Sequence, residues 1–490
     1  MLIEAIACGN TSPSPLSRFF RLITGLLIIG TLLGGCDLLK QFTQLKPPGP
    51  NQPLVVGLLA DPVFQQVAPN SEGMDGFSRD LIRLFAKELG VELQPIVVPD
   101  YPALLEMLHA GKVHMAASLP FRSDDPTVIY SQPLRETRQV IVHHASSLPI
   151  SALDKLAGRE ITLMTRAPQV GALRALQLNP LPLLVELGGK NELELLAGVA
   201  KRHHVLVATD ELHFAIAANL YPDIEIALEL PEKLAYGWGF QAASGGDLLL
   251  RATRFIESIK ADGTLRQLND RYFGHIRRMD SRDIEVFLEH VRGRLPRYRQ
   301  AFQEAQEITR IDWRLLAALA YQESKWDPFA TSPTGVRGIM MLTEETADRL
   351  GVTNRLDPHE SILAGANYLA SLMDDLPAEI KQPDRRWLAL AAYNLGMGHL
   401  RGGMHFAPGL KRDPYLWVDM KEILPLLSQP EYYERLKSGR ARGGEAVVLV
   451  ENIRNYYDVL SRFAPVYTPP SLGESTPPKK ASRKLSANRG

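Results

Sequence analysis

The hydrophobic residues of this chain follow one pattern in its first half and another in its second half. Between about residues 53 and 275, short apolar runs alternate with stretches in which apolar residues recur every three or four positions. The runs are typical of buried strands, and the recurring stretches are typical of helices with one apolar face. The pattern predicts, in order, a strand at 54–59, a helix at 78–89, a strand at 91–98, a helix at 101–110 and a strand at 114–118. Because strands and helices alternate, we expect an α/β domain.

From about Asp283 to Phe463, long helical stretches rich in Leu, Ala, Arg and Glu replace the strands, which predicts an all-α domain. One of its helices should run from Ile311 to Ser324, with Asp312 as its N-cap. A glutamate lies on the apolar stripe of this helix. It is Glu323, which shares the stripe with Leu315, Leu316, Leu319 and Ala320.

Glu323 is the candidate catalytic residue of the helical region. A carboxyl on the core-facing side of a helix loses water, which raises its pKa and keeps a proton available near neutral pH. A general acid that protonates a glycosidic oxygen needs this property. The alternative is that Glu323 turns toward solvent or pairs with Lys325, and spacing alone favours this alternative.

The N-terminal segment is typical of an exported protein. Arg18 and Arg21 precede an apolar run from Leu22 to Leu33, which is shorter than the ~20 residues of a membrane-spanning helix. The segment that follows, Leu33–Cys36, resembles the lipobox of bacterial lipoproteins. This resemblance implies that residues 1–35 are a signal peptide and that Cys36 carries a lipid.

Two further segments are predicted to lie outside the folded domains. Residues 36–52 include Lys46–Pro50, whose prolines indicate a stiff, extended linker. Residues 466–490 are rich in Pro, Ser and Lys, so we expect a disordered, basic tail.

Charge and cysteine content exclude several classes of function. The 55 Lys and Arg residues balance the 55 Asp and Glu residues, so the chain has no basic field for binding nucleic acid. Its two cysteines, Cys8 and Cys36, both lie near the N-terminus, which leaves the folded domains without a disulfide framework or a thiolate metal site.

The first half resembles the family 3 solute-binding proteins of bacterial transport. The resemblance rests on three phrases, which are Gly76–Leu81, Tyr130–Pro133 and Asp262–Leu265. It implies two hinged lobes, one of roughly residues 53–144 and 236–275 and the other of roughly 147–230, with a small ligand between them. The pairing with the second half of the chain, described below, makes a muropeptide one candidate for this ligand and leaves other small molecules open.

Two residues of this half are candidates for contact with that ligand. Relatives that hold amino acids carry an arginine near the position of Asp124, and Arg122 is displaced from it by about two residues. Arg122 is therefore either a ligand contact or a solvated turn residue. Asp210 either lines the cleft or begins a solvated helix.

The second half resembles the lytic transglycosylase domain, which is related in fold to goose-type lysozyme. Three phrases carry this resemblance, namely Glu323–Met341, Ala391–Gly396 and Arg454–Tyr456. Val336 and Met341 depart from the usual Ala and Gln. In these two departures and in the order of its two domains, the chain resembles the membrane-bound lytic murein transglycosylase F family.

This resemblance implies that Glu323 cleaves the glycan strands of peptidoglycan without adding water. It would protonate the oxygen that leaves N-acetylmuramic acid, assisted by the acetamido group of that sugar. As a base, it would then take the proton of the C6 hydroxyl, which closes a 1,6-anhydro ring. No cofactor and no metal are expected.

The same resemblance assigns substrate contacts to five other residues, which are Ser332, Met340, Tyr393, Asn394 and Tyr456. Tyr456 is expected to carry its hydroxyl toward Glu323, and the other four have structural alternatives. Ser332 precedes Pro333 and would suit a turn, Met340 would suit the core, and the Tyr393–Asn394 pair closes a helix before Gly396. Asp327 precedes Pro328, so we expect a turn there rather than a second catalytic carboxylate.

The predicted fold class is thus a bilobed α/β domain followed by an all-α-dominated, lysozyme-like domain. The predicted segments are 1–35 (signal peptide), 36–52 (linker), 53–275 (solute-binding-like domain), 276–296 (helical connection), 297–465 (catalytic domain) and 466–490 (tail).

Two other functions stay open, a solute-binding sensor with a helical scaffold and a lysozyme-type hydrolase. The periplasmic face of the outer membrane is the expected location. The alternative is the inner membrane, because an aspartate directly after the lipidated cysteine, here Asp37, is a retention signal for that membrane in some bacteria.

Overall fold

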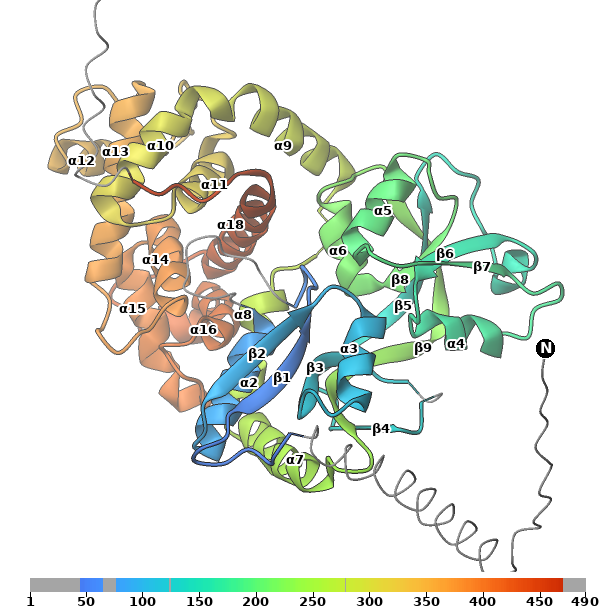
Figure 1. Ribbon diagram of the computed structural model, residues 1–490. Coiled ribbons are helices and arrows are strands. Elements are labelled where there is room, and N and C mark those ends of the chain that lie inside the picture. The colour runs from blue at the N-terminus through green and yellow to red at the C-terminus, as the bar shows by residue number, and fades with distance from the viewer. Residues whose placement is uncertain (1–44, 65–75, 123–124, 278, 470–490) are drawn as a thin grey trace, which may run out of the picture. The chain divides into compact units, whose positions relative to one another are not determined.

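The computed structural model describes residues 45–64, 76–122, 125–277 and 279–469 (Figure 1). The chain forms two compact units. The first contains the described residues up to Ala60, together with Leu81–Pro133 and Tyr236–Phe255. The second contains the described parts of Asp61–Asp80, Leu134–Ala235 and Ile256 onward, so it combines an α/β lobe with the helical half of the chain.

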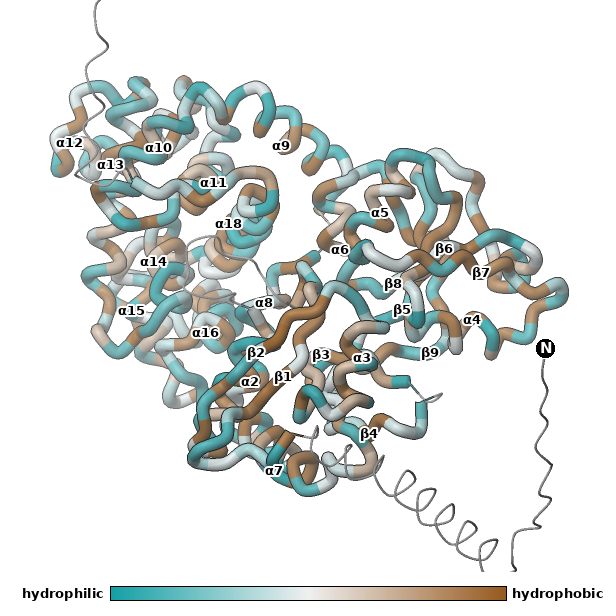
Figure 2. The backbone as a smooth tube through the Cα atoms, viewed as in Figure 1, coloured by the Kyte–Doolittle hydropathy of each residue, from teal (hydrophilic) through white to brown (hydrophobic). Residues whose placement is uncertain are grey.

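A parallel ladder forms the centre of the first unit. β1 (Leu54–Leu59) pairs in parallel with β2 (Leu93–Val98) on one side and with β3 (Met115–Pro120) on the other. All six residues of β1 are buried, and its trace is largely apolar in Figure 2, as expected for a parallel strand covered on both faces. The last part of β9 (Ile224–Gln241) pairs antiparallel with β3 and with β4 (Val128–Tyr130).

The helices of the first unit are α3 and most of α2 and α7, which span Tyr101–His109, Phe77–Leu89 and Gly246–Ala261. The segment at 45–52 also belongs to this unit. His114 Nε2 lies 2.8 Å from the carbonyl of Lys46, and Gly49 and Gln52 exchange two main-chain hydrogen bonds. The described part of the predicted linker therefore forms a turn that contacts the first unit.

The α/β lobe of the second unit has strands in the order β5-β8-β6-β7. These strands are β5 (Arg135–His144), β8 (Val207–Asp210), β6 (Glu160–Met164) and β7 (Leu183–Leu187). β5 runs antiparallel to β8, and β6 runs parallel to both β7 and β8. The short helices of this lobe are α4 (Gln169–Ala175), α5 (Glu192–Ala200) and α6 (Glu211–Ala218), with a 3₁₀ turn at Leu153–Leu156.

The helical half of the chain includes α11 (Trp313–Ser324), which packs mainly against α18 and α10. Every residue of α11 except Gln322 and Glu323 is buried, so this helix is a central element that is apolar all round rather than along one stripe. The others are α8 (Thr264–Phe273), α9 (Ser281–Gly293), α10 (Leu295–Thr309), α12 (Glu344–Arg349), α13 (Pro358–Asp374), α14 (Asp384–Leu395), α15 (Met397–Phe406), α16 (Trp417–Ile423), α17 (Pro430–Tyr433) and α18 (Gly443–Phe463), with 3₁₀ turns at Pro408–Leu410 and Leu424–Ser428.

The structure confirms the predicted succession of strands and helices in both halves. The strand at 54–59 has the expected bounds, and the helix expected at 78–89 begins one residue earlier. The strand expected at 114–118 extends to Pro120. No helix in the described ranges is both long and apolar enough to cross a membrane. The predicted signal peptide, Cys36 and the tail after residue 469 lie outside the described residues.

Candidate active site

Helix α11 places Glu323 in its last turn. Asp312 caps the start of the helix, because its carboxylate accepts a hydrogen bond from the Arg314 amide at 2.8 Å. The helix ends at Ser324, since Lys325 and Trp326 have left-handed φ angles of 55° and 58°. The predicted N-cap and the predicted end of the helix are therefore confirmed.

The Glu323 carboxyl is desolvated. Burial alone raises its pKa from the ordinary 4.5 to about 7. Within the described part of the chain, no hydrogen bond or ion pair reaches this carboxyl. Lys325, the alternative partner, instead places its Nζ 4.6 Å from the ring centre of Tyr321 and 5.4 Å from that of Tyr456. Glu323 can thus hold or release a proton near neutral pH.

The loop that follows α11 is attached to the helix by two residues of the Glu323–Met341 phrase. Ser324 Oγ donates to the carbonyl of Ile339 at 2.8 Å, and Trp326 Nε1 donates to the carbonyl of Ala317 at 2.8 Å. Both side chains are buried. Because these contacts fix a loop that leaves the helix directly beside Glu323, Ser324 and Trp326 position the site rather than react.

Gly338 has a steric role in the same loop. Its φ is +84°, and a Cβ built there would lie 1.9 Å from the carbonyl oxygen of Arg355. Only glycine fits so close to another main chain. Gly338 therefore lets the loop pack against the segment before α13.

Ser332 and Met340, two of the predicted substrate contacts, make contacts within the protein itself. Ser332 Oγ accepts hydrogen bonds from the amides of Thr334 and Val336 at 3.2 and 3.3 Å, which is a turn. The Met340 side chain is fully buried and packs against Gly365. Both residues lie near the end of α11 along the chain, but their contacts fit the structural alternatives. A substrate contact by either remains a prediction.

Tyr393 lies beside Glu323. Its hydroxyl donates to the carbonyl of Met340 at 2.8 Å. Burial and then the neighbouring charge of Glu323 and the phenol of Tyr368 raise the pKa of Tyr393 well above its usual value. Tyr368 on α13 stacks at a tilt against Tyr393, with ring centres 5.2 Å apart. Nothing in the sequence spacing of Tyr368 indicates this contact.

Asn394 and Gly396 close α14. Asn394 is exposed, so its side chain is accessible for a ligand. Gly396 has a φ of +88°, and its amide donates to the carbonyl of Ala392 at 2.8 Å. The predicted end of the helix at Gly396 is confirmed.

Tyr456 belongs to an aromatic group next to α11. Its hydroxyl accepts a hydrogen bond from Lys325 Nζ at 3.3 Å, and a substrate contact by Tyr456 remains a prediction. Its ring lies 4.8 Å from that of Tyr321 and 4.7 Å from that of Phe287. Because α18 packs its Tyr456 face against α9 and α11, the hydroxyl meets the lysine that follows the helix.

Arg454, the first residue of the Arg454–Tyr456 phrase, holds α8 against the helical region. It is 1 % exposed, and its guanidinium donates to Glu451 at 2.8 Å and to the carbonyl of Asp270 at 2.6 Å. Lys421 also pairs with the Asp270 carboxylate. This phrase therefore contains a residue that joins the last helix of the predicted solute-binding domain to the predicted catalytic domain.

The two residues predicted to contact a ligand of the first domain, Arg122 and Asp210, differ in burial and in their partners. Arg122 is partly buried, and its positive charge favours the ionised form of the Asp125 carboxyl. Asp210 is 1 % exposed and caps α6, accepting hydrogen bonds from the amides of Leu212 and His213. The helix start predicted at Asp210 is confirmed, but it is buried rather than solvated, because its other oxygen faces the His213 ring.

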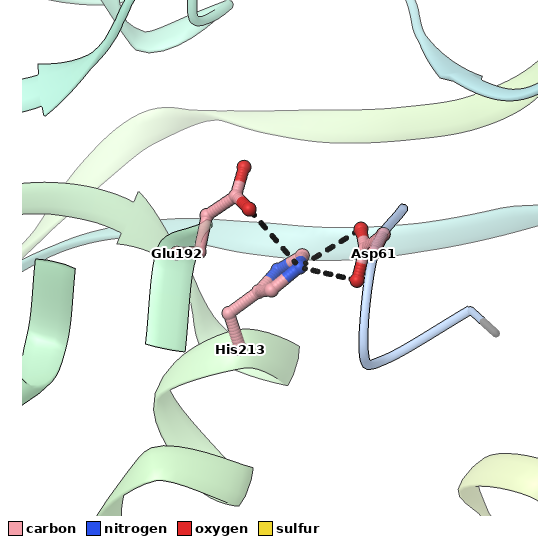
Figure 3. Close-up of side chains that lie close together, drawn as sticks. All are labelled: Asp61, Glu192 and His213. Carbon is pink, nitrogen blue, oxygen red and sulfur yellow. Dashed lines mark hydrogen bonds and ion pairs between the residues drawn. The ribbon is translucent and has the colours of Figure 1, made fainter. Parts of the chain in front are cut away.

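One group of side chains in the described ranges has ligand atoms close enough to hold a metal ion, namely Asp61, Glu192 and His213 (Figure 3). One ligand atom of each residue lies within 4.8 Å of those of the other two. The group does not include Glu323.

Comparisons with protein families agree with this division of the chain. Residues 54–275 match the model of bacterial extracellular solute-binding proteins, family 3, and residues 300–406 match that of the Transglycosylase SLT domain. A histidine kinase sensor domain with similarity to periplasmic binding proteins aligns to 45% of this chain and 96% of its own, at 15% identity and a TM-score of 0.40. Fold and site thus define a solute-binding domain fused to a transglycosylase domain.

Relatives that match this chain over most of its length identify the family. The chain is 41% identical over 460 residues to the membrane-bound lytic murein transglycosylase F of Nitrosospira multiformis, covering 92% of this chain and 94% of the relative. It is 41% identical over 427 residues to the protein of the same name from Thiobacillus denitrificans, covering 86% and 90%. The chain belongs to the membrane-bound lytic murein transglycosylase F family.

Proposed function

We propose that this protein is a peptidoglycan lytic transglycosylase in which Glu323 performs both proton transfers. The observation that carries the proposal is a carboxyl whose pKa burial raises to about 7, at the end of the central helix of the SLT domain. Such a carboxyl is partly protonated and partly ionised at neutral pH. It can therefore act first as an acid and then as a base.

The reaction breaks the bond between C1 of N-acetylmuramic acid and O4 of N-acetylglucosamine. Glu323 gives its proton to O4 as this bond breaks, and the acetamido group of the muramic acid assists at C1. The ionised Glu323 then takes the proton of the C6 hydroxyl, and O6 bonds to C1. The products are a free O4 hydroxyl and a 1,6-anhydro ring, and the enzyme regains its proton.

The surroundings of Glu323 favour this reaction over hydrolysis. Most hydrolases that cleave glycosidic bonds pair two carboxylates, one of which activates water or attacks C1. No second carboxylate contributes to the raised pKa of Glu323. Asp327, the nearest candidate along the chain, accepts a hydrogen bond from the Phe329 amide at 2.9 Å and so serves a turn.

Digestion of purified sacculi tests the proposal. The full chain in mild detergent and its Glu323→Gln variant are incubated with sacculi, and the products are identified by mass spectrometry. We expect anhydromuropeptides from the wild type and a loss of roughly 10² to 10⁴-fold in the variant. Glu445→Gln is the matched control, because Glu445 is an exposed glutamate of the same domain. Products with reducing ends would instead support a hydrolase.

The solute-binding domain is proposed to regulate the catalytic domain. Supporting contacts run from α8 to the helical region, where Arg266 pairs with Asp419 at 2.7 Å and Asp270 pairs with Lys421 and Arg454. A muropeptide bound by the solute-binding domain would act by favouring one arrangement of these helices. Adding muropeptide should change the rate of the wild type but not that of an Asp270→Asn variant with the same basal rate. Equal responses of both proteins would refute this route.

Anchoring at the periplasmic face of the outer membrane through a lipid on Cys36 is the last part of the proposal. The relatives are named membrane-bound, and the lipobox-like phrase before Cys36 supplies the means. Metabolic labelling with a radioactive fatty acid should mark the wild type and not a Cys36→Ser variant. Separation of the two membranes by density then decides between the outer membrane and the inner membrane.

A further inference from the structure

A buried cluster in the second compact unit combines the His213 imidazole with the carboxylates of Asp61 and Glu192 (Figure 3), and the Asp210 carboxylate lies on the other side of the ring. Asp61 lies two residues after β1, Glu192 is the first residue of α5, and His213 lies in the first turn of α6. His213 Nε2 is 3.1 Å from Asp61 Oδ2 and 4.0 Å from Glu192 Oε2. Residues far apart along the chain thus converge on one ring nitrogen.

The other ring nitrogen of His213 is held by Asp210. His213 Nδ1 lies 2.6 Å from Asp210 Oδ2, while Asp210 Oδ1 accepts the amides of Leu212 and His213. With Nδ1 hydrogen-bonded to the Asp210 carboxylate, Nε2 faces Asp61 and Glu192, and a metal ion that binds there would displace the proton that Nε2 shares with Asp61. Histidines that bind metals in proteins are oriented by a hydrogen bond of this kind on the second nitrogen.

Asp61 is fixed in a similar way. Its Oδ1 accepts a hydrogen bond from the Val63 amide at 2.7 Å, and Oδ2 is the atom nearer to His213 Nε2. Phe64 packs against the His213 ring, with ring centres 6.3 Å apart. The segment after β1 therefore closes over the imidazole and presents one carboxylate oxygen to it.

The cluster has an excess of negative charge in a place that excludes water. The side chains of His213, Asp61 and Asp210 are 0, 3 and 2 % exposed, and that of Glu192 is 12 % exposed. A protonated His213 offsets one of the three carboxylates. Arg135 is a further cation whose charge acts on Asp210, whereas Asp61 and Glu192 face each other across His213. Buried carboxylates are stable when a cation pairs with them, so the cluster suits an additional positive charge.

We propose that Asp61, Glu192 and His213 bind one divalent transition-metal ion of the zinc class. Zinc binds imidazole nitrogen and carboxylate oxygen at about 2.0 to 2.2 Å, so two of its ligands lie at most ~4.4 Å apart. The 3.1 and 4.0 Å separations at His213 Nε2 fit this limit. Calcium and magnesium prefer oxygen ligands alone, which the imidazole does not match. The ion would join the segment after β1 to α5 and α6.

Metal content and affinity test this proposal directly. The full chain without a histidine tag is stripped with a chelator in mild detergent, and zinc binding is measured by isothermal titration and elemental mass spectrometry. We expect one tightly bound equivalent, and a loss of at least tenfold in affinity in Asp61→Asn and in Glu192→Gln. The matched control is Glu225→Gln, because buried His143 has a single carboxylate partner there, at 3.2 Å. This control should bind zinc like the wild type.

Cobalt provides a second measurement that does not depend on stability. Co²⁺ in a site of nitrogen and oxygen ligands absorbs visible light, and the spectrum changes when one ligand changes. We expect a different spectrum in Glu192→Gln, which keeps the size of the side chain, and an unchanged spectrum in Glu225→Gln. A wild type that binds no zinc or cobalt, or variants that bind them equally well, would show that a proton alone bridges the cluster and would overturn the proposal.

Discussion

Two glutamates of this protein, Glu323 and Glu192, share a pKa of about 7 and reach it in different ways. Burial is the whole cause at Glu323. At Glu192, burial is the largest cause, the charge of His213 lowers the pKa, and the carboxylate of Asp61 raises it again. The same pKa thus describes a carboxyl without a charged partner and a carboxyl inside a charged cluster.

The difference between the two sites indicates what each can do. Glu323 has no partner that competes for its proton, so the proton is available to a substrate oxygen. Glu192 faces His213 and Asp61, so its protonation is tied to theirs and a cation can replace the protons. An isolated carboxyl suits catalysis by proton transfer, while a clustered carboxyl suits cation binding.

The largest expected effect comes from removing the imidazole of the cluster. In His213→Gln, three buried carboxylates lose their one shared cationic partner, and the unfolding free energy should fall by roughly 3 to 5 kcal/mol. Chemical denaturation of the full chain at pH 7 measures this loss. His143→Gln, which affects a single partly exposed carboxylate, is the control and should cost much less. A loss below that of the control would mean that the cluster needs no cation.

Removing the charge of Glu323 should raise the unfolding free energy at alkaline pH, whereas removing the His213 imidazole should lower it. Its folded pKa of about 7 exceeds the ordinary 4.5, so its contribution is present at acid pH and is lost as the pH rises through 7. At pH 8.5 the ionised carboxyl should cost about 3 kcal/mol, at 1.36 kcal/mol per pKa unit. Glu323→Gln should therefore melt above the wild type at pH 8.5, and the difference should vanish near pH 4. A variant that melts below the wild type at pH 8.5 would place the carboxyl in water.

The rate of cleavage should follow the proton of Glu323. Because the acid must be protonated before the bond breaks, activity should fall about tenfold per pH unit above pH 7, to about one hundredth at pH 9. Initial rates of anhydromuropeptide release between pH 5 and pH 9 measure this profile, with the melting temperature followed at each pH. A rate that is constant up to pH 9 in folded protein would exclude Glu323 as the acid.

The smallest expected effect concerns the wall of the Glu323 site. Tyr393→Phe removes the hydroxyl that donates to Met340 and leaves that carbonyl without this partner, which should cost about 1 kcal/mol. The aromatic ring against Tyr368 is retained. We expect a small drop in melting temperature and an activity within tenfold of the wild type. A loss as large as that of Glu323→Gln would give the Tyr393 hydroxyl a direct part in catalysis.

The parts of the site that sequence predicts well are local. Asp312 as N-cap, the end of α11 after Ser324 and the turn at Asp327 each depend on residues within a few positions of one another. The place of Glu323 beside Leu319 and Ala320 also pointed to burial and a raised pKa, but spacing alone favoured the exposed alternative and the Glu323–Met341 phrase was needed to decide. Local spacing fixes which face of a helix a residue occupies, but not whether a long side chain stays in the core.

The parts that sequence did not predict depend on contacts between distant segments. Tyr368 meets Tyr393 through the packing of two helices, and Lys325 turns to Tyr456 rather than to Glu323. Asp210 was expected to be solvated, yet it is buried because the His213 ring covers it. In each case the partner is chosen by packing, which leaves no periodic signal in the sequence.

The sequence by itself determined the order of the two domains, the helix that carries Glu323 and the family to which the chain belongs, since these follow from local patterns and motifs. Only the tertiary structure decided which charged groups share a buried volume. Asp61 and His213 are separated by 152 positions, and their pairing depends on how the segment after β1 packs against α6. The energy of a charge depends on distance and on the exclusion of water, and both are properties of the folded chain.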